Sequence, residues 1–273
     1  MPFIAAQDGT QLYYKDWGQG RPVVLIHGWP LDADMWEYQA PVLAEAGFRV
    51  IAYDRRGFGR SDQPWSGYDY DTMADDLKAV MDRLDLKDAA LVGFSMGGGE
   101  IARYLSRHGG TRVSRAVLVS AVTPMLLKTD DHPEGIDRGV FQRIVTSLRA
   151  DRPQFLTEFS KSFFGVGLLT SPVSSDLVQW TGRLAMLASP KATTDCVWAL
   201  AATDFRPDMK AFTVPTLVIH GDADHTVPIN VSGKAAAAAI PGAVLKVYAG
   251  APHAIPLTHK DELNRDLLTF LQA

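Results

Sequence analysis

Short apolar runs separate longer amphipathic segments along most of the chain. Four runs are almost wholly apolar and rich in valine, leucine, isoleucine or alanine; they lie at residues 23–26, 89–92, 116–119 and 216–219. Runs of this kind are typical of parallel strands that are buried on both faces of a sheet. Two further strands are predicted at 48–53 and 245–248. Strands alternating with helical spacing predict an α/β fold, with a mostly parallel central sheet and helices on both faces.

The start of the chain departs from this pattern. Asp8-Gly9 lies between residues 3–6 and 12–17, which both have strand character, and this dipeptide is a strong hairpin signal. We therefore predict an antiparallel hairpin before the first buried strand. Helices are predicted from Asp71 and from Glu100 onward, at the alanine run 235–239, and at about 260–271.

The alternation of strands and helices stops between about residues 125 and 206. This segment has no strand pattern and four helical patterns, which lie at 136–148, 155–163, 177–187 and after Ser189-Pro190. An all-helical insertion between two parts of one sheet predicts a cap over the carboxyl ends of the strands, where open α/β sheets bind ligands. We predict that residues 1–124 and 207–273 form the α/β core and residues 125–206 the helical cap.

The composition narrows the classes of function. The chain has 273 residues, a formal net charge of −4 and no basic run longer than Arg55-Arg56, so neither a nucleic acid nor a membrane is an expected partner. No stretch has the roughly 20 apolar residues of a membrane-spanning helix, and we expect no signal peptide. Cys196 is the single cysteine and is expected in the core; no intramolecular disulfide can form, which fits a cytoplasmic location.

One segment combines a strand, a sharp turn and a helix. Gly93-x-Ser95-x-Gly97 follows the apolar run at 89–92 and precedes the helical pattern that includes Glu100. Small residues two positions before and after a serine allow such a turn to close, which strains the serine backbone and exposes its hydroxyl. The helix N-terminus also favours developing negative charge. We therefore predict that Ser95 is a nucleophile.

A serine nucleophile needs a histidine base that is oriented by a carboxylate. A Gly-x-Ser-x-Gly turn in this setting is typical of α/β-hydrolases, in which the acid and then the histidine follow the serine along the chain. Of the seven histidines, His253 lies just after the last strand and can reach over the carboxyl edge of the sheet. His220, at a strand end, and His225, beside the candidate acids, are not expected to be the base.

Two carboxylates follow the strand at 216–219. Asp222, next to Gly221, is suited to holding the turn through hydrogen bonds to the backbone. Asp224 is better placed to reach the histidine, and it is the predicted acid, with Asp222 as the alternative. The segment after the 116–119 strand, where some hydrolases carry the acid, has no carboxylate in Ser120-Ala121-Val122-Thr123.

Two backbone N–H groups must stabilise the charge on a substrate oxygen. Met96, which follows the nucleophile, supplies one, and Trp29, in the turn after the first buried strand, is the candidate for the other. Pro30 favours an extended backbone at Trp29, and His27 is expected to shape the turn. The sequence shows no metal-ligand spacing, phosphate loop or dinucleotide motif, so no cofactor is expected.

Taken in order, the motifs resemble the bacterial arylesterase and cofactor-free haloperoxidase (perhydrolase) branch of the α/β-hydrolases. The matching segments are His27-Gly28-Trp29, 32–39, 54–61, 93–99, 203–209, His220 to Asp224 and Ala251-Pro252-His253. The similarity extends from about Gly9 to Phe270. The resemblance implies the same residues for the triad (Ser95, Asp224 and His253) and for the oxyanion hole (Trp29 and Met96).

The resemblance also implies an activity. Members of this branch hydrolyse small esters, some act on lactones or cyclic amides, and with hydrogen peroxide and a carboxylic acid they make peracids that oxidise halide without a metal. Pro30 is similar to the proline that follows the tryptophan in the better perhydrolases. The family is often trimeric or hexameric. Substrate contacts are expected at Pro30, Phe94, Val122, Phe159, Phe163 and Val227.

Three alternatives stay open at this point. The same triad serves lactonases and amidases, and it also serves carbon–carbon hydrolases, so residue types alone do not separate these reactions. A non-catalytic ligand receptor can keep both the fold and the triad. Ala254 and Thr226 depart from the family pattern near the predicted site, which leaves the acyl preference undetermined.

Overall fold

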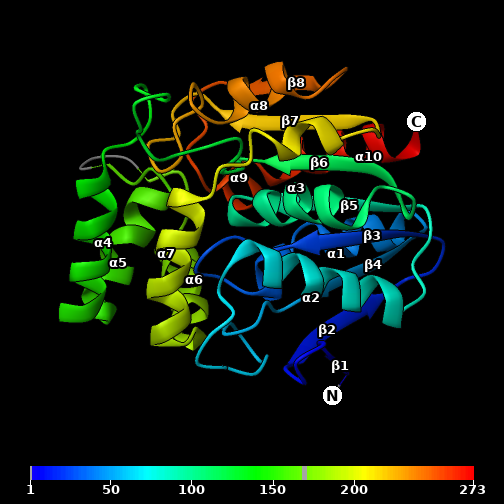
Figure 1. Ribbon diagram of the computed structural model, residues 1–273, viewed down its shortest axis with the longest axis horizontal. Coiled ribbons are helices and arrows are strands. Elements are labelled where there is room, and N and C mark those ends of the chain that lie inside the picture. Colours follow the sequence, from blue (N-terminus) through cyan, green and yellow to red (C-terminus); the bar gives the residue numbers. More distant parts are fainter. Residues whose placement is uncertain (1, 168–170) are drawn as a thin grey trace.

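An eight-stranded sheet runs through the molecule in the computed structural model, which describes residues 2–167 and 171–273 (Figure 1). The strands are β1 (Phe3–Ala5), β2 (Gln11–Trp17), β3 (Arg21–Ile26), β4 (Phe48–Tyr53), β5 (Ala89–Phe94), β6 (Val113–Val119), β7 (Thr216–Gly221) and β8 (Val244–Tyr248). Their order across the sheet is β1-β2-β4-β3-β5-β6-β7-β8. The first two strands pair antiparallel as a hairpin, β2 is antiparallel to β4, and all remaining pairs are parallel. The predicted α/β fold and hairpin are confirmed.

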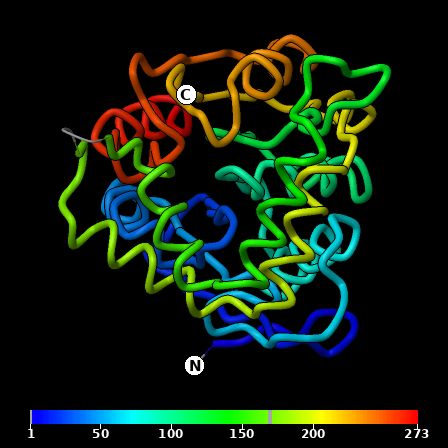
Figure 2. The backbone as a smooth tube through the Cα atoms, turned by 90° about the vertical axis from the view of Figure 1, so that its left-hand side faces the viewer, coloured from blue at the N-terminus to red at the C-terminus, as the bar shows by residue number. Residues whose placement is uncertain are grey.

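Helices cover both faces of this sheet. They are α1 (Ala40–Glu45), α2 (Tyr70–Arg83), α3 (Met96–His108), α8 (Gly233–Ala239), α9 (Ile255–Thr258) and α10 (Lys260–Gln272), with the 3₁₀ turns η1 (Ala33–Trp36) and η2 (Asp208–Ala211). Helices α2 and α3 pack side by side on one face, whereas α1 and α10 meet on the other, as the end-on view shows (Figure 2). None of the described helices combines the length and apolar character needed to cross a membrane.

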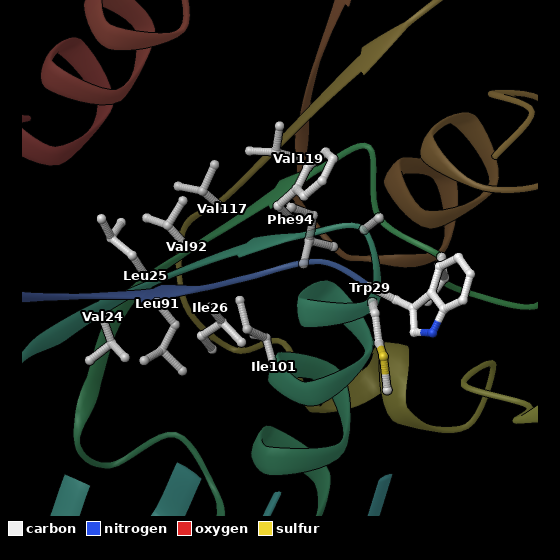
Figure 3. Close-up of a cluster of buried hydrophobic side chains, with 14 of the residues drawn as sticks. Val24, Leu25, Ile26, Trp29, Leu91, Val92, Phe94, Ile101, Val117 and Val119 are labelled. Atoms are coloured by element: carbon white, nitrogen blue, oxygen red, sulfur yellow. The ribbon is translucent and has the colours of Figure 1, made fainter. Parts of the chain in front are cut away.

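The hydrophobic core lies on both faces of the sheet, because the central strands carry apolar side chains on both sides. Leu25, Val92 and Val117 point to one face of the sheet, and Val24 and Leu91 point to the other (Figure 3). All five are fully buried, as expected for parallel strands with helices above and below them. The central strands therefore form a rigid platform, and β3, β5 and β7 end at its carboxyl edge.

Four further helices stand beyond that carboxyl edge (Figure 1). They are α4 (Arg138–Ala150), α5 (Arg152–Phe163), α6 (Ser175–Leu187) and α7 (Pro190–Ala202). Each begins after a residue whose side-chain oxygen accepts a backbone N–H of the first turn; these residues are Asp137, Asp151, Ser174 and Ser189. The four helical patterns expected between residues 125 and 206 are thus present.

Some boundaries differ from the prediction. Helix α3 begins at Met96, four residues before Glu100, because the three glycines that follow Met96 hide the start of the apolar spacing. Helix α9 and the two 3₁₀ turns are four residues long each, which is too short to show a period in the sequence.

Candidate active site

Ser95 lies at a sharp corner between β5 and α3. Its φ is 53°, in a region that only glycine adopts readily. A Cβ on Gly93 would lie 2.5 Å from the carbonyl oxygen of Gly97, and one on Gly97 would lie 2.4 Å from that of Ile26. Both glycines are therefore required for the corner to close, and the strained turn expected from the sequence is present.

The structure brings Ser95, His253 and Asp224 together. The Nε2 atom of His253 lies 3.0 Å from Ser95 Oγ, and its Nδ1 atom lies 2.6 Å from Asp224 Oδ2. All three side chains are buried. The other carboxylate oxygen, Oδ1 of Asp224, accepts the backbone N–H groups of Thr226 and Val227 at 2.9 and 2.8 Å. These bonds hold the carboxylate so that Oδ2 meets the histidine.

The surroundings of Asp224 decide its charge. Burial on its own would raise the pKa of this carboxyl, but the His253 ring, together with hydrogen bonds from His220 and His253, holds the pKa well below its usual range. Asp224 is thus ionised at neutral pH, as the orienting acid of a histidine base must be. Asp222, the alternative acid, is exposed and accepts the N–H of Gly250 at 2.6 Å.

The two predicted oxyanion donors lie beside Ser95, the predicted nucleophile. Met96 is the first residue of α3, and Trp29 lies beyond the end of β3, next to the start of that helix (Figure 3). Within the described residues, the backbone N–H groups of Trp29 and Met96 have no hydrogen-bond partner. The Trp29 indole is fixed separately, because its Nε1 donates to the carbonyl of Thr193 in α7 at 3.0 Å. Both N–H groups therefore lack a partner in the described part of the protein, as the predicted oxyanion hole requires.

A buried ionic network supports the Trp29 turn. Arg55, which is 1% exposed, donates through Nη2 to the carbonyl of His27 at 2.7 Å and through its backbone N–H to His27 Nε2 at 2.9 Å. Its Nε pairs with Glu100 of α3, which also accepts the Tyr53 hydroxyl at 2.6 Å. The charged loop at 54–61 is thus mostly buried, and it lies beneath the predicted oxyanion turn.

Aromatic rings surround the triad. The Phe94 and Phe163 rings lie with centroids 5.0 and 5.6 Å from that of His253. Phe159 packs edge to face on Trp29 at 5.2 Å and is 5.9 Å from Phe163. Since Phe159 and Phe163 come from α5, this helix brings an apolar wall toward the reacting groups.

The remaining predicted substrate contacts also lie near the triad. The backbone N–H of Val122 donates to the carbonyl of Ser95 at 3.2 Å, and Val227 follows Asp224 in its loop. Pro30 borders a narrow space that Phe159 and Phe163 also line. All six residues therefore lie in the neighbourhood of the triad, and their contact with a substrate stays a prediction.

One residue near the triad was not expected there. The Nε2 atom of His220 lies 3.3 Å from Asp224 Oδ2, so the carboxylate meets two histidines. The only sign of this contact in the sequence is that Asp224 follows His220 by four residues, with His220 near the end of a strand and Asp224 in the loop after it. Among the described residues no group of three or more His, Cys, Asp or Glu side chains could hold a metal ion. Cys196 is fully buried in α7, and burial raises the pKa of its thiol.

The chain is similar to known proteins over its whole length. The family described as the alpha/beta hydrolase fold matches residues 21–260. A putative non-heme chloroperoxidase of Synechocystis is 50% identical, and a bifunctional esterase/perhydrolase of Acinetobacter calcoaceticus is 40% identical, each with full coverage of both chains. Among solved structures, a bromoperoxidase from Bacillus anthracis has a TM-score of 0.96 at 49% identity, covering 99% of both chains. An esterase from Exiguobacterium antarcticum has a TM-score of 0.94 at 36% identity, again over 99% of both chains.

Proposed function

We propose a mechanism for this chain from the premise that it belongs to the α/β-hydrolase family. It is a serine hydrolase that acts on small carboxylic esters, and it has perhydrolase activity with hydrogen peroxide. In our proposal the catalytic residues are Ser95, His253 and Asp224. The observation that carries the proposal is the chain of hydrogen bonds from Ser95 Oγ through His253 to Asp224, at 3.0 and 2.6 Å.

In the first half-reaction Ser95 becomes acylated. His253 Nε2 takes the hydroxyl proton as Ser95 Oγ attacks the ester carbonyl carbon. The carbonyl oxygen becomes negatively charged and binds the free N–H groups of Trp29 and Met96. The bond to the leaving oxygen then breaks, and His253 returns the proton to the departing alcohol. The ionised Asp224 stabilises the imidazolium that forms in between.

In the second half-reaction the acyl group is transferred from Ser95 to one of two competing nucleophiles, water or hydrogen peroxide. Water gives up a proton to His253 Nε2 and attacks the acyl carbon, which releases the carboxylic acid and returns the proton to Ser95. Hydrogen peroxide follows the same path and releases a peracid. Acylation by a free carboxylic acid is the reverse of the hydrolytic step, so acid and peroxide together yield peracid and water. The peracid then oxidises halide in solution.

The helices between residues 125 and 206 form a cap in this proposal. They lie over the carboxyl edge of the sheet, and α5 carries Phe159 and Phe163 toward the triad. We further propose a cytoplasmic location, which rests on the single Cys196, and a trimer or hexamer, which rests on the family resemblance. Light scattering coupled to size-exclusion chromatography tests the assembly.

The test of the proposal is Ser95→Ala. Hydrolysis of p-nitrophenyl acetate, and peracid formation from acetate and hydrogen peroxide, are each expected to fall roughly a thousandfold or more, because one nucleophile serves both reactions. Ser66→Ala, at an exposed position in the loop before α2, is the matched control and is expected to keep both rates. Full activity in Ser95→Ala, or loss of only one of the two reactions, would contradict the single acyl-enzyme.

A further inference from the structure

His220 is a buried histidine that the proposed mechanism leaves without a role. It lies at the end of β7, and its side chain is fully buried. Its Nε2 atom is 2.9 Å from the carbonyl oxygen of Val227 and 3.3 Å from Asp224 Oδ2. A carbonyl oxygen only accepts hydrogen bonds, so Nε2 carries the proton and donates it to Val227, and Asp224 Oδ2 is a second, longer contact of the same nitrogen.

The other nitrogen of the ring, Nδ1, is tightly enclosed. Within the described residues Nδ1 has no hydrogen-bond partner. A Cβ on Gly233, the first residue of α8, would lie 2.6 Å from this nitrogen, so the ring occupies space that only glycine leaves. His220 is therefore a fixed donor that presents one N–H toward the carboxylate.

Both oxygens of the Asp224 carboxylate contact N–H groups of the protein. Oδ1 accepts two backbone N–H groups of its own loop, whereas Oδ2 lies 2.6 Å from His253 Nδ1 and 3.3 Å from His220 Nε2. A rotation about the Cβ–Cγ bond moves both oxygens together, and the two backbone bonds to Oδ1 restrain that rotation from one side of the carboxylate only. A second donor on Oδ2, carried by a strand of the rigid sheet, opposes that rotation.

We propose that His220 is a positioning residue for the catalytic carboxylate. Its Nε2–H keeps Asp224 Oδ2 on the line to His253 Nδ1 and takes up part of the negative charge on that oxygen. The proposal rests on the assignment of Asp224 and His253 to the triad and adds a second histidine that acts through the acid, without touching the substrate.

The charge that His220 takes up has a consequence for pH dependence. The titratable groups in ionic contact with Asp224, among the described residues, are His253 and His220, and His253 itself faces Asp224 and the rings of Phe94 and Phe163. Without His220 the full charge of Oδ2 faces His253, whose imidazolium then keeps its proton to a higher pH. Since only the neutral ring accepts the Ser95 proton, the acid limb of the activity profile moves upward.

The test compares His220→Phe, which keeps a ring but removes the donor, with His220→Gln, whose side-chain amide can place an N–H near Nε2. His132→Phe is the matched control, because His132 is also buried but pairs with Glu134 in another loop. We would measure kcat and KM for p-nitrophenyl acetate from pH 5 to 9. Active sites would be counted by stoichiometric phosphonate labelling of Ser95, so that any misfolded fraction is removed from the rates.

For His220→Phe we expect kcat per labelled site to fall about tenfold with KM changed less than about twofold, and the half-maximal pH of the acid limb to rise by about half to one unit. In His220→Gln, kcat per labelled site and the half-maximal pH of the acid limb should both return most of the way to the wild-type values. His132→Phe should match the wild type. If His220→Phe does not fold, His220→Asn, whose amide is too short to reach Oδ2, replaces it. An acid limb that does not move in the donor-free variant overturns the proposal. That failure differs from failure of the triad, in which Ser95→Ala would keep its activity.

Discussion

Pro30 follows the predicted oxyanion donor and has no backbone N–H of its own. Its ring restricts the backbone of Trp29, while the indole of Trp29 is bonded to Thr193. The Trp29 backbone is thus constrained from both the chain and the side chain. The backbone carbonyl of Trp29 accepts no hydrogen bond within the described residues, so this oxygen is free to accept one from a bound peroxide.

Pro30→Leu tests this arrangement. A leucine restores rotation about φ and relaxes the Trp29 carbonyl, so we expect the ratio of perhydrolysis to hydrolysis to fall several-fold while ester hydrolysis stays within about threefold. The measurement is the partition of a common acyl-enzyme between water and added hydrogen peroxide. A ratio equal to that of the wild type would exclude a role for Pro30 in peroxide selection.

Residues were predictable where a local pattern dictates them. Ser95 follows from the glycines of its own turn, and His253 follows from its place after the last strand. The contact between His220 and Asp224 was not foreseen, although both lie in one short segment, because it depends on how the loop folds back on the strand. Local spacing predicts the nucleophile, but the partners of a carboxylate are set by the tertiary structure.

At the scale of elements, the Arg55–Glu100 pair joins the loop after β4 to α3, the helix that follows Ser95. Tyr53, at the end of β4, and His27, after β3, complete the network, so three elements meet beneath the oxyanion turn. Glu100 is fully buried. A buried pair of this kind gives little net stability, but the loss of one partner leaves an uncompensated charge.

Glu100→Gln keeps the shape and removes the charge. The buried Arg55 then lacks an anion, and we expect the free energy of unfolding to fall by about 3–5 kcal/mol. Urea denaturation followed by circular dichroism measures it, and Glu158→Gln on the exposed face of α5 should change it by less than about 0.5 kcal/mol. A loss below about 1 kcal/mol in Glu100→Gln would show that the charge on Arg55 is compensated in another way.

Elements with a clear period were predicted, and short ones were not. The helices α4 to α7 show apolar spacing over three turns or more, and the central strands are short apolar runs. Helix α9 has a single turn, so no period can form in its sequence. The burial of the charged loop at 54–61 could not be predicted from the sequence either, because its charged side chains pair with residues far away in the chain, such as Glu100.

At the scale of the whole molecule, a group of acidic side chains makes stability depend on pH. Burial, together with the charges of Asp54 and Asp34, raises the pKa of Asp32 from 3.8 to about 7. The unfolded chain loses this proton near pH 4, whereas the folded protein keeps it until about pH 7. Between these values the folded state binds more protons, so the stability from this group is present below about pH 4 and is lost as the pH rises through about 7.

Asp32→Asn removes this dependence. The amide imitates the protonated acid, so the variant and the wild type should be equally stable near pH 4, and the variant should be more stable by about 2–4 kcal/mol at pH 8. Chemical denaturation at the two pH values measures the difference. Asp130→Asn, at an exposed position, should show no such trend. An equal gain at both pH values in Asp32→Asn would point to packing and not to the proton.

The indole of Trp29 donates to Thr193, which lies 164 positions later in the chain, in α7. A change of shape in α7 therefore displaces Trp29, whose backbone N–H is proposed to stabilise the developing charge. Helix α5 carries aromatic rings toward the predicted pocket but has no hydrogen bond to Trp29 among the described residues. Selection for new ester substrates is thus expected to accumulate substitutions in α5 sooner than in α7. Substitutions in α5 change the apolar wall but leave the hydrogen bond between Trp29 and Thr193 in place, whereas a change of shape in α7 disturbs that bond and slows every reaction. Sequencing variants selected on a bulky ester would show which helix evolves first.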